Sequence, residues 1–146
     1  MNTLSTIMAS FALLLGSILT QDTLEVPNAV KNAFSQNFNN SAGADWKKIS
    51  NGYEVDFDLG TVAHAARYTA DGELLMVKME MNEQDLPTVI LQRIIDDFRQ
   101  FEITDIDQIK VADRLLIQVA LRGPSEDRKV VFTPDGKTDS TFPYWN

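Results

Sequence analysis

The chain has 146 residues, and its 13 lysines and arginines against 21 aspartates and glutamates give a net charge of −8. It has one histidine and no cysteine. These counts exclude disulfides, thiolate metal sites, iron–sulfur clusters and a cysteine nucleophile. The negative charge argues against nucleic-acid binding, because phosphate backbones are negative too. A length of this order indicates one compact globular unit.

The first 21 residues contain no charged side chain, and residues 7–19 form an almost unbroken apolar run. A helix that spans a membrane takes roughly 20 residues, so this run is short for a span. Its length and position are typical of the apolar region of a signal peptide. We therefore predict a signal peptide at residues 1–21, no membrane span, and a periplasmic or secreted protein. A buried N-terminal helix is the alternative.

The rest of the chain reads as two successive copies of one pattern. The segment around Pro27 (VPNAV) matches the segment around Pro87 (LPTVI), 60 residues later. Further along, residues 69–72 (TADG) match residues 133–136 (TPDG), now 64 residues later. The sequence therefore predicts a tandem duplication, with copies at residues 22–83 and 84–146. We place the four extra residues of the second copy near the turn at residues 123–125, where insertions cost least.

Each copy predicts a helix that begins at its proline, because the first helical position needs no backbone N–H. Four strands follow in each copy, ended by turn pairs such as Asn51-Gly52 and Asp71-Gly72. The strands are expected at residues 45–50, 53–59, 62–69 and 74–81, then at 106–111, 115–122, 129–133 and 137–142. This order predicts the α+β class, with a repeated α-β-β-β-β unit, antiparallel meander sheets and the helices on one face.

Several segments now carry a resemblance. These are Trp46-Lys47-Lys48, the strand that starts Gly52-Tyr53-Glu54-Val55, and the Asp-Gly turn before the last strand of each copy. Over about residues 25–142 the pattern resembles the beta-lactamase-inhibitor-like, PepSY-like family of exported bacterial proteins. The resemblance implies the repeated unit described above and a protein that is not an enzyme. It does not by itself imply inhibition.

No group of residues predicts catalysis. His64 lies in a predicted strand between alanines, and we interpret it as structural, because acid–base catalysis needs a partner and a pocket. Met76, Met79 and Met81 are soft ligands that could bind Cu(I), but their alternation favours packing. Phosphate-binding, dinucleotide-binding and nucleophile-elbow motifs are absent from the sequence. We therefore predict no enzyme, no metal site and no cofactor.

Carboxylates gather on one side of the strand at residues 53–59. Tyr53, Val55, Phe57 and Leu59 alternate with Glu54, Asp56 and Asp58, so the acidic side chains share a face. A solvated strand face explains such a row. Weak binding of a divalent ion is the alternative, because carboxylate oxygens are the usual ligands of Ca²⁺.

Apolar side chains are also expected on the sheet face away from the helices. A sheet face that no helix covers is usually polar, so apolar residues there indicate a protein-binding surface. We predict that this partner surface comprises Glu54, Asp56, Asp58, Leu74, Met76, Leu116 and Val131. Two alternatives are that the C-terminal tail with Phe142, Tyr144 and Trp145 folds over the face, or that a second copy covers it.

The functional prediction follows from these residues together. We expect a non-catalytic exported binding module, inhibitor-like in kind, that engages a protein partner through the open sheet face. The alternative is a periplasmic protein that binds divalent ions through the acidic strand face. Neither the identity of the partner nor the oligomeric state follows from the sequence.

Overall fold

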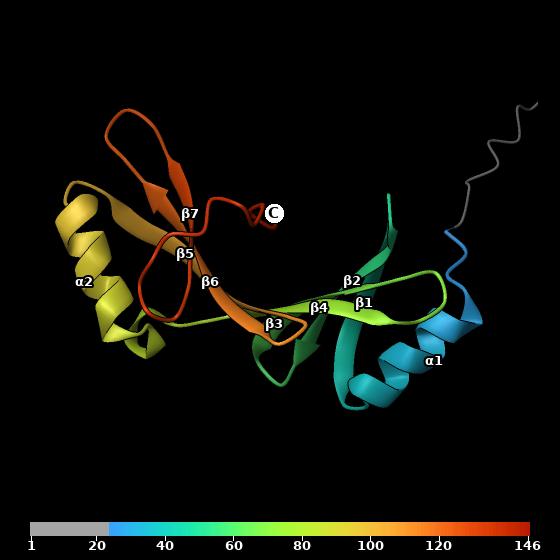
Figure 1. Ribbon diagram of the computed structural model, residues 1–146. Helices are drawn as coiled ribbons and strands as arrows, with labels where there is room; N and C mark the ends of the chain where they lie inside the picture. The colour runs from blue at the N-terminus through green and yellow to red at the C-terminus, as the bar shows by residue number, and fades with distance from the viewer. Residues whose placement is uncertain (1–23) are drawn as a thin grey trace, which may run out of the picture.

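The computed structural model describes residues 24–146, so the predicted signal peptide lies outside the described residues. Seven strands form one antiparallel sheet in which each strand pairs with the next along the chain. Figure 1 shows the two α-helices near opposite ends of the sheet and the C-terminal end near its middle. The elements are α1 (Asn28–Asn37), β1 (Ser41–Ile49), β2 (Gly52–Leu59), β3 (Val62–Tyr68), β4 (Leu74–Glu80), the 3-10 turn η1 (Glu83–Asp85), α2 (Thr88–Asp97), β5 (Glu102–Val111), β6 (Arg114–Arg122) and β7 (Arg128–Phe132).

The two helices begin and end in the same way. Pro27 and Pro87 are the N-cap residues, so each helix begins one residue later than predicted, and the proline carbonyl oxygens accept hydrogen bonds from the N–H groups of Lys31 (3.1 Å) and Leu91 (3.0 Å). The helices end where the N–H groups of Phe38 and Phe98 bond to the carbonyl one turn earlier, both at 2.8 Å. No helix in the described part of the chain is long and apolar enough to cross a membrane.

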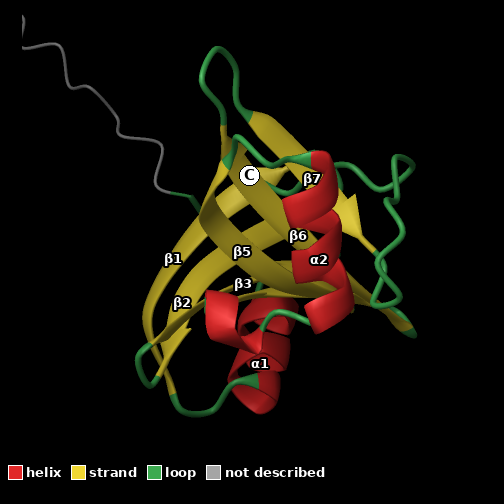
Figure 2. Ribbon diagram, turned by 90° about the vertical axis from the view of Figure 1, so that its left-hand side faces the viewer, coloured by secondary structure: helices red, strands yellow, loops and turns green. Residues whose placement is uncertain are grey.

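Both helices cover the same face of the sheet. Helix α1 packs Val30 and Phe34 against the inward residues of β2 and β3, and α2 packs Ile90 and Ile94 against those of β6 and β7. Residues that pair across neighbouring strands point to the same face of the sheet. Val55 pairs with Ala66, Ala66 with Val77, and Val77 with Lys110, so these side chains share the helix face from β2 to β5. Figure 2 shows α1 and α2 in front of this sheet. The α+β class and the antiparallel meander are confirmed.

Matching turns close the two halves. Gly72 (φ 90°) and Gly136 (φ 84°) each lie against the first turn of the helix of their own half. A side chain on Gly72 would come within 2.7 Å of the Ala29 carbonyl oxygen, and one on Gly136 within 2.9 Å of the Val89 side chain. Because both sites need a positive φ and a close approach, glycine is required in each turn.

The register corrects the expected place of the four extra residues. Trp46 pairs with Val55 in the first hairpin, and Ile106 pairs with Val119 at the corresponding place in the second. From that pair to the turn, the first hairpin has three more residue pairs and the second has five. The two additional pairs contain four residues. The extra residues therefore lie at the tip of the β5–β6 hairpin. Strand side chains alternate every second residue, so a hairpin that is longer by two residues in each strand keeps the same apolar pattern, and the sequence does not show where the four residues lie.

The eighth strand, predicted at residues 137–142, does not form. Only Thr138 pairs, in a single bridge to Phe132. Asp139 then folds the chain into a turn, because its carboxylate accepts bonds from the N–H groups of Thr141 (2.9 Å) and Phe142 (3.2 Å). The equivalent strand of the first half, β4, is held from both sides by β3 and β5. The turn at Asp139 takes the place of the predicted strand.

Candidate functional site

The C-terminal residues 143–146, called the tail below, lie on the sheet face that the helices do not cover. Trp145 is only 2% exposed, although it is the second-last residue of the chain. It packs on a small cluster of apolar residues from the strands beneath it. The buried members of that cluster are Ala65, Ile109, Leu116 and Val131. The alternative in which the tail folds over this face is therefore the arrangement in the structure.

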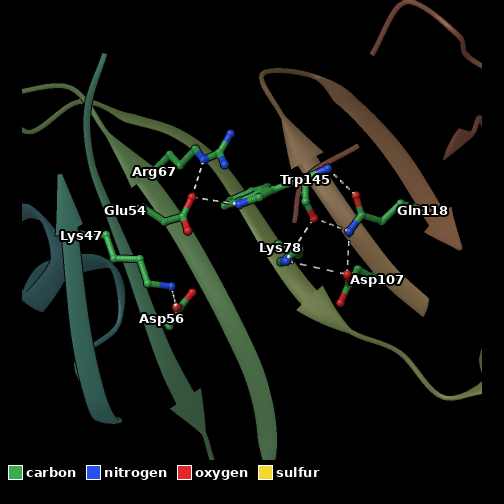
Figure 3. A network of polar contacts seen from close by, with 8 residues as sticks. All are labelled: Lys47, Glu54, Asp56, Arg67, Lys78, Asp107, Gln118 and Trp145. Carbon is green, nitrogen blue, oxygen red and sulfur yellow. Dashed lines mark hydrogen bonds and ion pairs between the residues drawn. The ribbon is translucent and has the colours of Figure 1, made fainter. Parts of the chain in front are cut away.

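Every polar group of Trp145 has a partner on the sheet, as Figure 3 shows. The backbone N–H donates to Oε1 of Gln118 at 3.0 Å. The backbone carbonyl oxygen accepts from Nε2 of Gln118 at 2.8 Å and from Nζ of Lys78 at 3.3 Å. The indole Nε1–H donates to Oε2 of Glu54 at 2.9 Å. The sheet thus holds both the main chain and the side chain of this residue.

Glu54 is buried and depends on Trp145 and Arg67 for its hydrogen bonds. Arg67 Nε donates to the same Oε2 atom of Glu54 at 2.6 Å, while the guanidinium carbon lies 4.3 Å from the centre of the indole ring. Lys78 Nζ lies 5.4 Å from that ring. Cations over an aromatic face are attracted to it, most strongly when water is excluded. The indole therefore meets an anion at its N–H and two cations at its face.

Asp107 orients the amide that holds the tail. Gln118 is fully buried, and its Nε2 donates to Oδ2 of Asp107 at 2.7 Å as well as to the Trp145 carbonyl. Lys78 Nζ lies 3.9 Å from the same carboxylate oxygen. Burial raises the pKa of Asp107, and the hydrogen bond from Gln118 opposes this rise. The hydrogen bond that Asp107 accepts from the side-chain NH2 group of Gln118 fixes the orientation of the amide. In this orientation the amide oxygen faces the Trp145 N–H and accepts its hydrogen bond.

The residues that hold Trp145 occupy corresponding places in the two halves. Glu54 pairs with Lys47 next to the Trp46–Val55 pair, and Gln118 pairs with Asp107 next to the Ile106–Val119 pair. Glu54 binds the indole, while Gln118 binds the main chain. The site therefore lies across the middle of the sheet and needs both halves.

The predicted partner surface divides into covered and open residues. Glu54, Leu116 (1% exposed) and Val131 (6% exposed) lie beneath the tail, so the expectation that they are open to a partner is wrong. The alternation of the strands placed them on the correct face, but it carries no information on where four terminal residues go. The open or half-open members are Asp56, Asp58, Leu74 (37% exposed) and Met76.

The acidic row does not act as one group. Glu54 is bound by Arg67 and Trp145, and Asp56 forms an ion pair with Lys47. Within residues 24–146 no group of three or more His, Asp or Glu side chains is placed to hold a metal ion. The geometry therefore offers no support for the divalent-ion alternative.

The histidine and the methionines occupy places in the packing. The ring of His64 stacks on Phe57, with centroids 5.4 Å apart, and its Nδ1 lies 2.9 Å from the Val62 carbonyl oxygen. Met81 packs against the α2 cluster and Met76 against the cluster under the tail, so the two methionines lie on opposite faces of the sheet.

The sheet has two open hollows outside the region that the tail covers. One lies on the helix face over β4, has a volume of about 460 Å³, and is lined by Phe38, His64, Leu75, Val77, Met79 and Lys110 among others. The other has a volume of about 340 Å³ and is lined by Gly43, Asp56, Phe57, Asp58, Ala63, His64, Ala65 and Lys78. The second hollow includes Asp56, Asp58 and Ala65 of the tail face, so part of that face stays open beside the tail.

Solved structures with the same architecture come from Bacteroides. A protein described as periplasmic, from Bacteroides eggerthii, matches with a TM-score of 0.74 at 17% identity, over 78% of this chain and 86% of that one. A DUF2874 family protein from Bacteroides uniformis gives 0.72 at 13% identity, over 77% and 85%. A BLIP-like protein from Bacteroides fragilis gives 0.70 at 15% identity, over 85% and 95%.

These likenesses establish a BLIP-like fold for this chain. No protein-family model matches the sequence, and no curated protein sequence matches it.

Sequence reasoning missed Arg67, Lys78, Asp107 and Gln118 as a connected group. One signal for it was present. Gln118 is the only polar residue in the run from Leu115 to Leu121, and a polar side chain in such a run needs a buried partner. Nothing in the sequence indicated that this partner would be the main chain of Trp145.

Proposed function

We propose that this chain is a non-catalytic exported binding module that engages a protein partner through the sheet face away from the helices. One observation carries the proposal: this face already holds an extended peptide segment, the tail, through its main chain and its tryptophan. Peptide-binding surfaces combine main-chain hydrogen bonds with a pocket for a side chain in this way.

The proposal also covers export, an inhibitor-like mode of binding, an origin by duplication and the kind of partner. The similar structures include a protein described as periplasmic and a BLIP-like protein, which supports export and an inhibitor-like mode of binding. The matched helix caps and glycine turns support an origin by tandem duplication, with units at residues 22–83 and 84–146. The PepSY-like part of the proposal rests on sequence segments alone, such as Trp46-Lys47 and Gly52-Tyr53-Glu54-Val55. The charge of −8 supports a protein partner rather than a nucleic acid.

The partner surface is larger than its open part. Asp56, Asp58, Leu74 and Met76 are open or half-open and can be reached at once. Glu54, Leu116 and Val131 become accessible only when the tail leaves, because they lie beneath it. A partner that uses the whole predicted surface must therefore displace residues 143–146.

Charge reversal at one open position tests this assignment. We expect Asp58→Lys to abolish capture of a specific envelope protein by the immobilised chain, because Asp58 is exposed beside the tail-face hollow. The matched control is Asp96→Lys, which makes the same charge change on α2, on the other side of the sheet. The binding affinity of the purified captured protein is then measured by calorimetry for both variants. Equal loss in the two variants, or loss in neither, contradicts the proposed surface.

A further inference from the structure

We propose that the sheet face beneath the tail is a recognition site for an extended, tryptophan-bearing segment of the partner, and that the tail occupies it as a built-in competitor. This inference rests on the proposed function and names the chemistry of the partner. It comes from the contacts that hold Trp145 to Glu54, Arg67 and Gln118.

The side-chain contacts select tryptophan. The buried carboxylate of Glu54 accepts the indole N–H, and phenylalanine has no such donor. With phenylalanine in the pocket, the Glu54 carboxylate would be removed from water without gaining this hydrogen bond, and the free energy of binding would be less favourable. Arg67 and Lys78 lie over the ring face, which favours the strongly negative face of an indole. The pocket therefore discriminates among aromatic side chains by the N–H group and by the ring.

The main-chain contacts select an extended segment in one direction. A single amide, that of Gln118, meets both the N–H and the carbonyl of the same residue. That pair of bonds requires extended backbone at the tryptophan, and exchanging the positions of its N–H and carbonyl would break both bonds. Because Asp107 fixes the amide from behind, Gln118 is already oriented when a new segment arrives.

The tail can leave without disturbing the sheet. Thr138 makes the last bridge to the sheet, and Asp139 anchors the chain just after it. The Asp139 N–H bonds to the Val131 carbonyl at 2.8 Å, and its carboxylate is paired with Arg114. Hydrogen bonds from Thr141 lower the pKa of Asp139 to about 2, so this anchor stays charged at neutral pH. Residues 143–146 form no strand pairs and are held by contacts with side chains of the sheet, such as Gln118, Glu54 and Lys129, so their release breaks no strand pairing.

The residue before the tryptophan is also recognised. Lys129 Nζ lies 4.9 Å from the centre of the Tyr144 ring, and Tyr144 is half-buried against the apolar cluster under the tail. Burial, with the nearby charges of Asp105 and Asp107, raises the pKa of Tyr144 to about 12, so its hydroxyl stays neutral. The site therefore fits two consecutive aromatic residues, of which the second is tryptophan.

A peptide with the tail's own sequence is the probe. A labelled peptide of residues 140–146 (STFPYWN) is titrated against the chain without its predicted signal peptide, as wild type and as Trp145→Ala. A tethered tail acts at millimolar effective concentration, so for an intrinsic Kd near ~10 µM the variant should bind about 100-fold more tightly than wild type. A peptide with Phe for Trp should lose at least about tenfold, and a scrambled peptide should not bind.

Asp96→Ala is the control, because Asp96 is exposed on α2, on the other side of the sheet, and touches no part of the tail. It should bind the peptide as weakly as wild type. A folded Trp145→Ala chain, with a cooperative melt, that fails to bind the peptide overturns the inference. Equal binding of the Trp and Phe peptides overturns it as well.

A second measurement keeps the test decisive if Trp145→Ala does not fold. Hydrogen exchange of the Trp145 indole N–H in the wild-type chain should proceed through local opening, many times faster than that of the fully buried Val119 amide. Exchange only at the rate of global unfolding shows that the tail is part of the core and ends the inference. If the peptide fails while Asp58→Lys still abolishes capture, the proposed function stands and only this inference falls.

Discussion

The two halves of the sheet are alike on one face and different on the other. Toward the helices, both halves present buried apolar side chains, such as Tyr68 and Phe132 at corresponding places. On the tail face, the first half has the charged neighbours Glu54 and Arg67, whereas the second half has Gln118 and Val131. Two halves with matching strand pairing can therefore present different surfaces, since strand residues alternate between faces.

Trp145 makes use of that difference. Its indole lies against the ionic pair of the first half, and its main chain lies against the neutral amide of the second. A site built from two identical halves would offer the tail the same group twice. The difference between the halves therefore gives the segment one orientation, and substitutions that remove the difference test this account.

The largest effect is expected at the hairpin tips, where the halves also differ. Gly52 has φ 144°, and a side chain there would come within 1.9 Å of the Tyr68 carbonyl oxygen. We expect Gly52→Ala to lower the free energy of unfolding by about 3 kcal/mol or more, measured by urea denaturation. Gly60→Ala is the control, because Gly60 also has a positive φ but open space around it, and it should cost about 1 kcal/mol. Equal costs would mean that the close approach does not matter.

A smaller effect is expected when the Glu54–Arg67 pair of the first half is replaced by the residues of the Gln118–Val131 pair of the second. Glu54→Gln leaves Arg67 without its buried carboxylate, so we expect a loss of about 1–2 kcal/mol in the free energy of unfolding. Adding Arg67→Val copies the Gln118–Val131 pair and should recover part of that loss, because no charge is then left unpaired. Urea denaturation of both single variants and the double variant measures the coupling. Strict additivity would show that the pair does not act as a unit.

The smallest effect is expected at the longer hairpin. Ala112 is the only non-glycine residue with a positive φ in the described range, at 52°, and it lies at the exposed tip between β5 and β6. Ala112→Gly should raise the free energy of unfolding by about 0.5 kcal/mol, because relief of the left-handed conformation exceeds the added entropy of glycine in the unfolded chain. Thermal and urea denaturation would both detect the change. A loss of stability would argue against strain at this tip.

The sequence predicted what depends on local pattern. The helices after Pro27 and Pro87, the glycine turns and the faces of Val55, Glu54, Leu116 and Val131 all follow from period and turn chemistry. The starts of β1 and β5 came out four residues late, because bulges at residues 42–45 and 103–105 interrupt the alternation there. The site itself could not be predicted, because it depends on the path of a four-residue tail, and that path is set by contacts with residues far away in the chain.

The order of the strands has a consequence for how the molecule is completed. Each strand pairs with its neighbour in the sequence, so most of the sheet forms from local contacts, which favours rapid folding. The bond between Trp145 and Glu54 joins residues 91 positions apart. A chain that emerges N-terminus first can build its hairpins in turn, but Glu54 has to wait for Trp145. The site therefore closes only after the strands of both halves have been made.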